Sequence, residues 1–130
     1  MILNLQPGIE NAVSRTVSKE DIATIFGSEH MPVLASSRII AFMEYVALSS
    51  VQGYLPQGYS TVGIEFQFEH KIPVTEGTNI ECLSRLTDVS GRKMTFEISV
   101  RTISSEIANA THIRAVINED AFERLIGDKK

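Results

Sequence analysis

Ser36, Glu44 and His70 are the residues of this 130-residue chain whose types and positions point to chemistry. A carboxylate and an imidazole that meet in a layer with little water can act as an acid and base pair. A serine hydroxyl beside the free backbone N–H groups of a helix start can hold an oxyanion or orient a nucleophile. These three side chains therefore predict an acid-base site, provided that the fold brings them together.

His70 occupies a position that a strand pattern reserves for a hydrophobic residue. In the segment TVGIEFQFEHKIP, residues 61–73, apolar residues alternate with polar ones up to Phe68, and His70 continues the apolar series. Alternation with a period of two predicts a strand with one buried face. A histidine on such a face is either a hydrogen-bonded core residue or a catalytic group, and the pattern leaves both interpretations open.

Glu44 is expected to point inward from the longest helix. Apolar residues recur at intervals of three and four between residues 37 and 54, which predicts a helix with one apolar stripe. At about 100° per residue, Glu44 lies about 40° from Ile40, near the middle of that stripe. A buried, unpaired carboxylate costs several kcal/mol, so it finds a partner or takes up a proton. The alternative is a glutamate at the edge of the stripe that reaches water or forms a structural ion pair.

Ser36 stands eight residues before Glu44, close to the same helix face. Serine is a preferred N-cap, so capping alone explains its presence as well as a catalytic role does. Gly63 interrupts the start of the strand that leads to His70, which predicts a bulge or a close approach of another group to the backbone.

The other two histidines, His30 and His112, are expected at the surface. His30 stands in a loop of irregular sequence, residues 28–37. His112 and Arg114 share one parity in the last alternating segment, opposite to that of the isoleucines there, so the same pattern places Arg114 outside the core.

The elements that must position these residues are one long helix and a mostly antiparallel sheet. The segment 10–17 alternates weakly, 19–26 has the acidic start and glycine end of a short helix, and 118–130 reads as a terminal helix. Four consecutive strands with short links are expected after the long helix, at residues 60–72, 79–88, 93–103 and 106–117. They predict an antiparallel meander with one dry face, which the long helix covers.

Composition restricts the class of protein. The length suits a single domain over residues 1–130, and a net charge of −4 without basic clusters argues against nucleic-acid binding. Cys82 is the only cysteine, which excludes an intrachain disulfide and leaves no metal-ligand spacing. The start MILNLQPGIE lacks an export signal and no apolar run is long enough to span a bilayer. We therefore expect a cytoplasmic protein without membrane partner, metal or cofactor.

The order of elements and the motifs resemble hotdog proteins of the fluoroacetyl-CoA thioesterase type. VLASSRIIAFMEY contains Ser36 and Glu44, TVGIEFQFEHKIPVTEG contains Gly63 and His70, and THIRAV contains Arg114. The resemblance covers about residues 30–117. It implies an α+β hotdog fold, in which an antiparallel sheet wraps around one long central helix. Ser36 stands where the family usually has threonine, and Ser37 where it usually has proline.

The resemblance also implies an activity and roles for single residues. It makes Ser36, Glu44 and His70 the catalytic groups and associates Gly63 and Arg114 with the bound acyl-CoA, so the surface position expected for Arg114 is revised. Hydrolysis of a small or medium acyl-CoA thioester is the expected function, with Glu44 as base or nucleophile. A non-catalytic acyl-CoA-binding module is the alternative, and a hydratase acting on enoyl-CoA is a third possibility.

The resemblance further implies a homodimer. Phe42 lies away from the main apolar stripe of the predicted helix. A lone domain would expose it, so we expect Phe42 or an edge strand to be buried between subunits.

Overall fold

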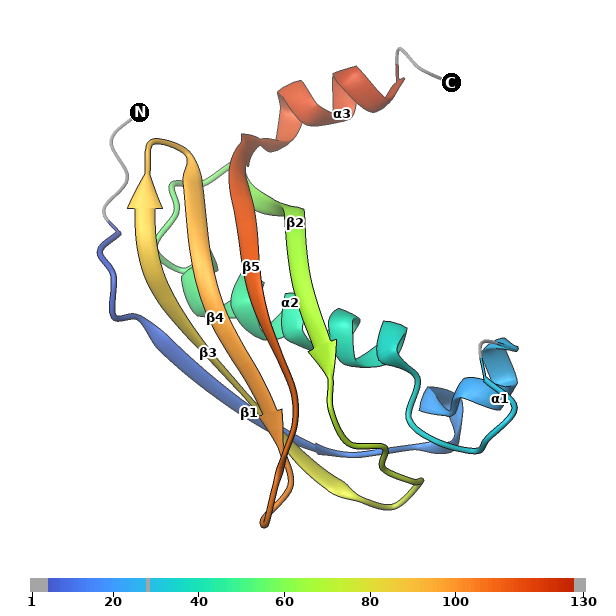
Figure 1. Cartoon of the computed structure of the whole chain (residues 1–130). Coiled ribbons are helices and arrows are strands. Elements are labelled where there is room, and N and C mark those ends of the chain that lie inside the picture. The colour runs from blue at the N-terminus through green and yellow to red at the C-terminus, as the bar shows by residue number, and fades with distance from the viewer. Residues whose placement is uncertain (1–4, 28, 128–130) are drawn as a thin grey trace.

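A curved sheet of five strands with one long helix across a face forms the protein in a computed structural model that describes residues 5–27 and 29–127 (Figure 1). The strands are β1 (Glu10–Thr16), β2 (Tyr59–His70), β3 (Asn79–Ser90), β4 (Lys93–Arg101) and β5 (Glu106–Asn118). The helices are η1 (Lys19–Asp21), α1 (Ala23–Phe26), α2 (Ser36–Gln52) and α3 (Glu119–Gly127). The α+β architecture expected from the sequence is confirmed.

The strand order is β1-β3-β4-β5-β2, with every pairing antiparallel. The prediction of a four-strand meander is therefore wrong for β2, which pairs with β5 and not with β3. After β2 the chain passes below the sheet and returns as β3 beside β1 (Figure 1). Alternation predicts which side chains of a strand are buried. It does not predict which strand lies beside it, because strand pairing depends on the connections between strands. As a result β2 is an edge of the sheet.

The buried stripe of α2 is rotated relative to the predicted one. Its buried residues are Ile39, Phe42, Met43, Val46, Ala47 and Val51. Ile40 is only half-buried and Tyr54 is exposed. Since β1 and β3 also pack on this helix, the core contacts reach further round it than the pattern of apolar spacing suggested.

Phe42 is 6% exposed within the single chain, so the expectation that a lone domain exposes it is wrong. The Arg15 guanidinium lies 5.5 Å from the centre of the Phe42 ring and covers it. The argument for a dimer therefore no longer rests on this residue.

The face of β5 that packs against α2 carries Ala108, Ala110, His112, Arg114 and Val116, all of them buried. Ile113 and Ile117 are only half-buried, so the prediction that the isoleucines of β5 mark its inner face is wrong for these two, whereas Ile107 is buried. The surface position expected for His112 is also wrong. His30 is exposed as expected. The apolar and polar faces of β4 agree with the prediction, since Met94, Phe96, Ile98 and Val100 are all buried.

A buried aspartate fixes the start of α2. Asp21 is 1% exposed and pairs with the guanidinium groups of Arg15 and Arg38, and its carbonyl accepts a hydrogen bond from the Ala35 N–H at 2.9 Å. Burial by itself raises the pKa of the Asp21 carboxyl, but hydrogen bonds from Ser18 and Arg38 and the charge of Arg15 outweigh it and lower the pKa. The first turn of α2 is therefore anchored beside the end of β1, which carries Arg15.

Candidate active site

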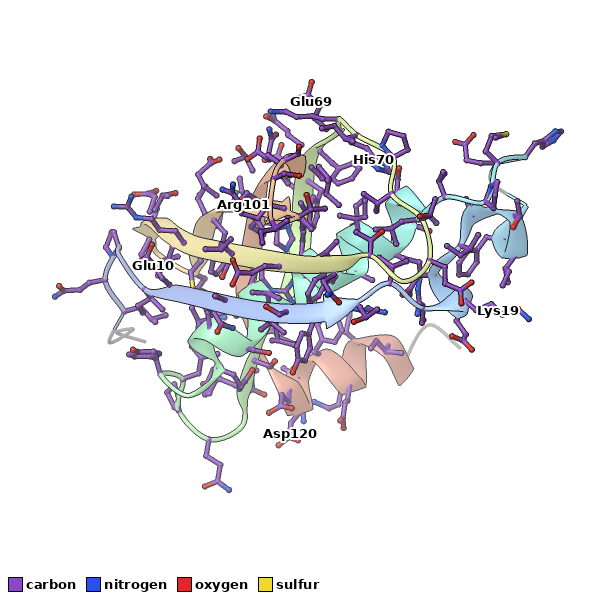
Figure 2. All side chains as sticks on the ribbon, turned by 90° about the horizontal axis from the view of Figure 1, so that it is seen from below. Glu10, Lys19, Glu69, His70, Arg101 and Asp120 are labelled. Atoms are coloured by element: carbon purple, nitrogen blue, oxygen red, sulfur yellow. The ribbon has the colours of Figure 1, made fainter. Side chains whose placement is uncertain are left out.

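Ser36 and His70 meet where α2 begins and β2 ends. The Ser36 hydroxyl oxygen lies 2.7 Å from His70 Nδ1. Ala35 is the N-cap residue of α2, with no side-chain cap, so the interpretation of Ser36 as an N-cap is wrong. Figure 2 shows the side chain of His70 at the end of β2, turned away from that of Glu69. The pair thus joins a helix start to a strand end by a side-chain contact.

An open cavity of about 340 Å³ lies over this pair. Its walls are formed by Glu29, Val33, Leu34, Ser36, His70, Lys71, Ile72 and Pro73. His70 Nε2 is buried and has no hydrogen-bond partner in the described part of the chain. If Ser36 donates its hydroxyl proton to Nδ1, Nε2 carries the ring proton and is the group left to donate to a ligand.

Glu44 lies two turns further along α2 and its side chain is 44% exposed. The prediction of a carboxylate pointing into the core is therefore wrong, and the stripe-edge alternative describes its position better. The side chain still faces a polar group, since Glu44 Oε2 lies 4.0 Å from Arg114 Nη1. This carboxylate has both a cationic neighbour and access to water.

Gly63 lets Glu44 approach the sheet. A Cβ built on Gly63 would lie 2.9 Å from Glu44 Oε2 and 2.9 Å from His112 Cε1, closer than real Cβ contacts. The pairing of β2 with β5 shifts between Gly63 and Glu65, which leaves Ile64 as an extra residue, 50% exposed. The predicted bulge and the predicted close approach are both present.

Arg114 and His112 form a buried polar network under this bulge. Arg114 donates from Nε to the Thr61 hydroxyl at 2.8 Å and from Nη2 to the Thr61 carbonyl at 2.9 Å. Its Nη1 lies 3.1 Å from His112 Nε2, and His112 Nδ1 lies 2.8 Å from the Glu65 carbonyl. The His112 ring stacks on Phe66 with centroids 4.0 Å apart.

Burial shifts the ionisation of both basic groups in this network. Loss of solvation lowers the pKa of His112, with the charge of Arg114 acting in the same direction against the hydrogen bond to Glu65. Loss of solvation also lowers the pKa of Arg114, and the Glu44 carboxylate opposes that shift. A neutral imidazole beside a guanidinium is the arrangement that these shifts favour.

The five predicted site residues thus form two groups in one chain. Ser36 and His70 are in contact, and Glu44, Gly63 and Arg114 lie together. The eight residues from Ser36 to Glu44 correspond to about 12 Å along a helix. The extended chain from Gly63 to His70 corresponds to about 23 Å along a strand. The fold of one chain does not join the two groups.

Thr61 and His112 were missed as site residues by the sequence reasoning. One signal was available for His112: it has the same parity as Arg114 and as the small residues Ala108 and Ala110, which places all four on one face of the strand. Nothing in the sequence marked Thr61.

Among the described residues, no group of three or more His, Cys, Asp or Glu side chains is arranged to hold a metal ion. No helix of the described segments is long and apolar enough to cross a membrane.

Comparison with known proteins gives one family and a consistent fold. Residues 17–120 match the family described as fluoroacetyl-CoA-specific thioesterase. The fluoroacetyl-CoA thioesterase of Streptantibioticus cattleyicolor is 26% identical over 102 residues, covering 78% of this chain and 73% of that protein. A solved structure of a fluoroacetyl-CoA thioesterase has a TM-score of 0.91 at 20% identity and covers 98% of both chains. A hot-dog-like protein from Thermanaerovibrio acidaminovorans has a TM-score of 0.88 at 16% identity, covering 96% of this chain and 93% of that one. These likenesses confirm the hotdog fold.

Proposed function

This chain belongs to the fluoroacetyl-CoA-specific thioesterase family and is an acyl-CoA thioesterase, and we propose that it hydrolyses small or medium acyl-CoA thioesters with Ser36, Glu44 and His70. The observation that carries this assignment is the contact of Ser36 with His70 over an open cavity, with Nε2 left unpartnered. A structural histidine would normally have both ring nitrogens satisfied.

In this proposal Glu44 is the general base. Its carboxylate takes a proton from a water molecule, the oxygen of that water bonds to the thioester carbonyl carbon, and the C–S bond then breaks to give the acid and the CoA thiol. The exposure of Glu44 supports a base that reaches water, and the Arg114 guanidinium lies 4.0 Å from its carboxylate.

Ser36 orients His70 in this proposal. By donating to Nδ1, the hydroxyl keeps the proton of His70 on Nε2, where it can donate a hydrogen bond to the carbonyl oxygen and stabilise the charge that develops there. The proton that Glu44 takes from water then passes to the leaving sulfur, which restores the carboxylate. Gly63 lies against the acyl-CoA at the bulge. Arg114 acts on the substrate indirectly, since its side chain is only 6% exposed.

A homodimer is the assembly in which the two groups of site residues meet. β2 is an edge strand, and its free N–H and C=O groups can pair with the same strand of a second copy. Antiparallel pairing about an axis near residues 66–67 would bring His70 of one subunit opposite Gly63 of the partner subunit.

We place this enzyme in the cytoplasm, since its one cysteine offers no disulfide.

Activity is tested with a panel of acyl-CoA thioesters of increasing chain length and detection of free thiol. Release of thiol from small or medium acyl chains supports the proposal. Tight binding without release across the panel supports the non-catalytic binding module instead, and water addition to enoyl-CoA without thiol release supports a hydratase.

The shared site is tested by mixing two inactive variants, Ser36→Ala and Glu44→Gln, after unfolding and refolding them together. If each site uses Ser36 and Glu44 from different subunits, half of the randomly formed dimers contain one intact site, and about a quarter of the parent activity returns. A mixture that stays inactive, or a monomer in sedimentation equilibrium at micromolar concentration, contradicts the shared site.

A further inference from the structure

The Arg114 guanidinium is held almost entirely by groups that lie outside the five residues assigned above. Three of its nitrogens have a partner on the inner face of the sheet: Nε and Nη2 on Thr61, and Nη1 on His112. Thr61 is 4% exposed and His112 is 0% exposed. We call these two residues the arginine socket. The one acidic side chain within 4.0 Å of this guanidinium in the described residues is Glu44.

Only one tautomer of His112 completes the socket. Arginine has donors and no acceptor, so His112 Nε2 must accept from Arg114 Nη1 and carry no proton. The other ring nitrogen, Nδ1, then carries the proton and donates it to the Glu65 carbonyl. That carbonyl lies just after the bulge of β2, so the bulge that makes room for Glu44 also selects the tautomer of His112.

We propose that Thr61 and His112 are positioning residues of the thioesterase reaction, which fix the Arg114 guanidinium so that it holds the Glu44 carboxylate in its reactive place. This inference rests on the proposed function of Glu44. A half-exposed glutamate on a helix has several rotamers available in water. A buried guanidinium with all three nitrogens held has two N–H groups left, one on Nη1 and one on Nη2, and each points in a fixed direction. Nη1 is the nitrogen that lies 4.0 Å from Glu44 Oε2, so its fixed position restricts that choice.

The tautomer is measured without any turnover. In ¹⁵N NMR spectra of the protein with labelled histidine, His112 is expected as the neutral form with the proton on Nδ1. The signal of the Arg114 Nε–H is expected to exchange slowly in the parent and faster in Thr61→Val, which loses the hydroxyl acceptor and keeps the shape. A proton on Nε2 of His112, or an Arg114 signal unchanged in Thr61→Val, overturns the socket.

The effect on catalysis is measured with the pair Thr61→Val and Thr61→Ser. Thr61→Val is expected to lower kcat about tenfold with KM within about twofold, as for loss of a hydrogen bond to a charged group that acts in the chemical step. Thr61→Ser keeps the hydroxyl and is expected to retain most of kcat. Equal kcat in Thr61→Val and the parent overturns the proposal.

A second background shows whether Thr61 acts through Arg114. In Arg114→Met, which is itself expected to lower kcat, adding Thr61→Val should change kcat by less than about twofold, because the guanidinium that it positions is gone. A further tenfold loss there means that Thr61 acts by another route, and the proposal fails. If the parent releases no thiol from any acyl-CoA, the proposed function fails, while the NMR measurement still decides the socket.

Discussion

The two groups of site residues differ in how completely their polar atoms are satisfied. At the start of α2, Ser36 is exposed, His70 is half-buried, and a buried ring nitrogen has no partner. Beside Glu44, two turns further along α2, Arg114 and His112 are buried. Both ring nitrogens of His112 and all three guanidinium nitrogens of Arg114 have a hydrogen-bond partner. The first group has capacity left for a ligand, and the second holds its own parts in place. We call Ser36 and His70 the open group, and Glu44, Gly63 and Arg114 with His112 the closed group. We infer that the open group contacts the thioester, and that the closed group fixes the Glu44 carboxylate, which activates the attacking water.

Among the variants that distinguish the two groups, removal of the His70 ring is expected to change catalysis most. His70→Ala should lower kcat/KM by roughly 10²- to 10⁴-fold, the range usual for loss of an acid-base group, with little change in folding. Thiol release and thermal unfolding are measured on the same samples. A large fall in Tm with parent-like activity in the folded fraction shows instead that His70 is a core residue.

Glu44→Gln is expected to lower thiol release at least about a hundredfold and to leave acyl-CoA binding intact. Glutamine keeps the volume of the side chain and loses the charge that accepts a proton from water. Stability should stay close to that of the parent, because the carboxylate is half-exposed and is not buried in the core. Parent-like turnover in this variant removes Glu44 from the mechanism.

Gly63→Ala tests how tightly the closed group is built. The added Cβ would lie 2.9 Å from both Glu44 Oε2 and His112 Cε1, so both side chains must move away or the backbone at residue 63 must shift. We expect a loss of about tenfold in kcat from the displaced carboxylate. Gly53→Ala is the matched control, since a Cβ there meets nothing within 4 Å and the backbone of Gly53 is in the ordinary helical region. Equal kcat in both variants contradicts a tightly built group.

The smallest expected effect is on the pH dependence of stability. Burial lowers the pKa of His112 in the folded protein below its ordinary value of 6.5, so the unfolded chain takes up this proton first as the pH falls. The contribution of neutral His112 to stability is therefore complete above about pH 6.5 and decreases below it. His112→Gln should show a smaller decrease in Tm between about pH 7.5 and pH 5.5 than the parent, whereas the exposed-site control His30→Gln should match the parent. Parallel curves for the parent and His112→Gln contradict a buried neutral imidazole.

Periodicity was sufficient to predict the type and approximate bounds of most elements. The long helix predicted at 37–54 and the strand predicted at 93–103 lie within a few residues of α2 and β4, because apolar spacing reflects which side chains a helix or strand can bury together. The terminal helix predicted at 118–130 agrees with α3 as far as residue 127, and residues 128–130 lie outside the described part of the chain. The one short helix expected at 19–26 is instead η1 and α1, separated by Ile22, whose extended backbone forms a bridge to Leu34. A long-range pairing of that kind leaves no local pattern.

The sequence by itself indicated the residues that we propose for the chemistry and determined how far apart they lie along each element: Ser36 and Glu44 on one helix, Gly63 and His70 on one strand. It also determined the strand–glycine–strand pattern that predicts the bulge. These are local properties, set by side-chain type and by the repeat of helix or strand.

Only the tertiary structure decided which of these residues are neighbours. It separated Ser36 and His70 from Glu44, turned His112 and Arg114 inward, and placed β2 at an edge beside β5. The physical reason is that strand order, the direction of a β-strand face and the partner of a buried charge depend on contacts between segments far apart in the chain. A polar pair such as Arg114 with Thr61, 53 residues apart, is buried because each group satisfies the other, and neither residue alone indicates this.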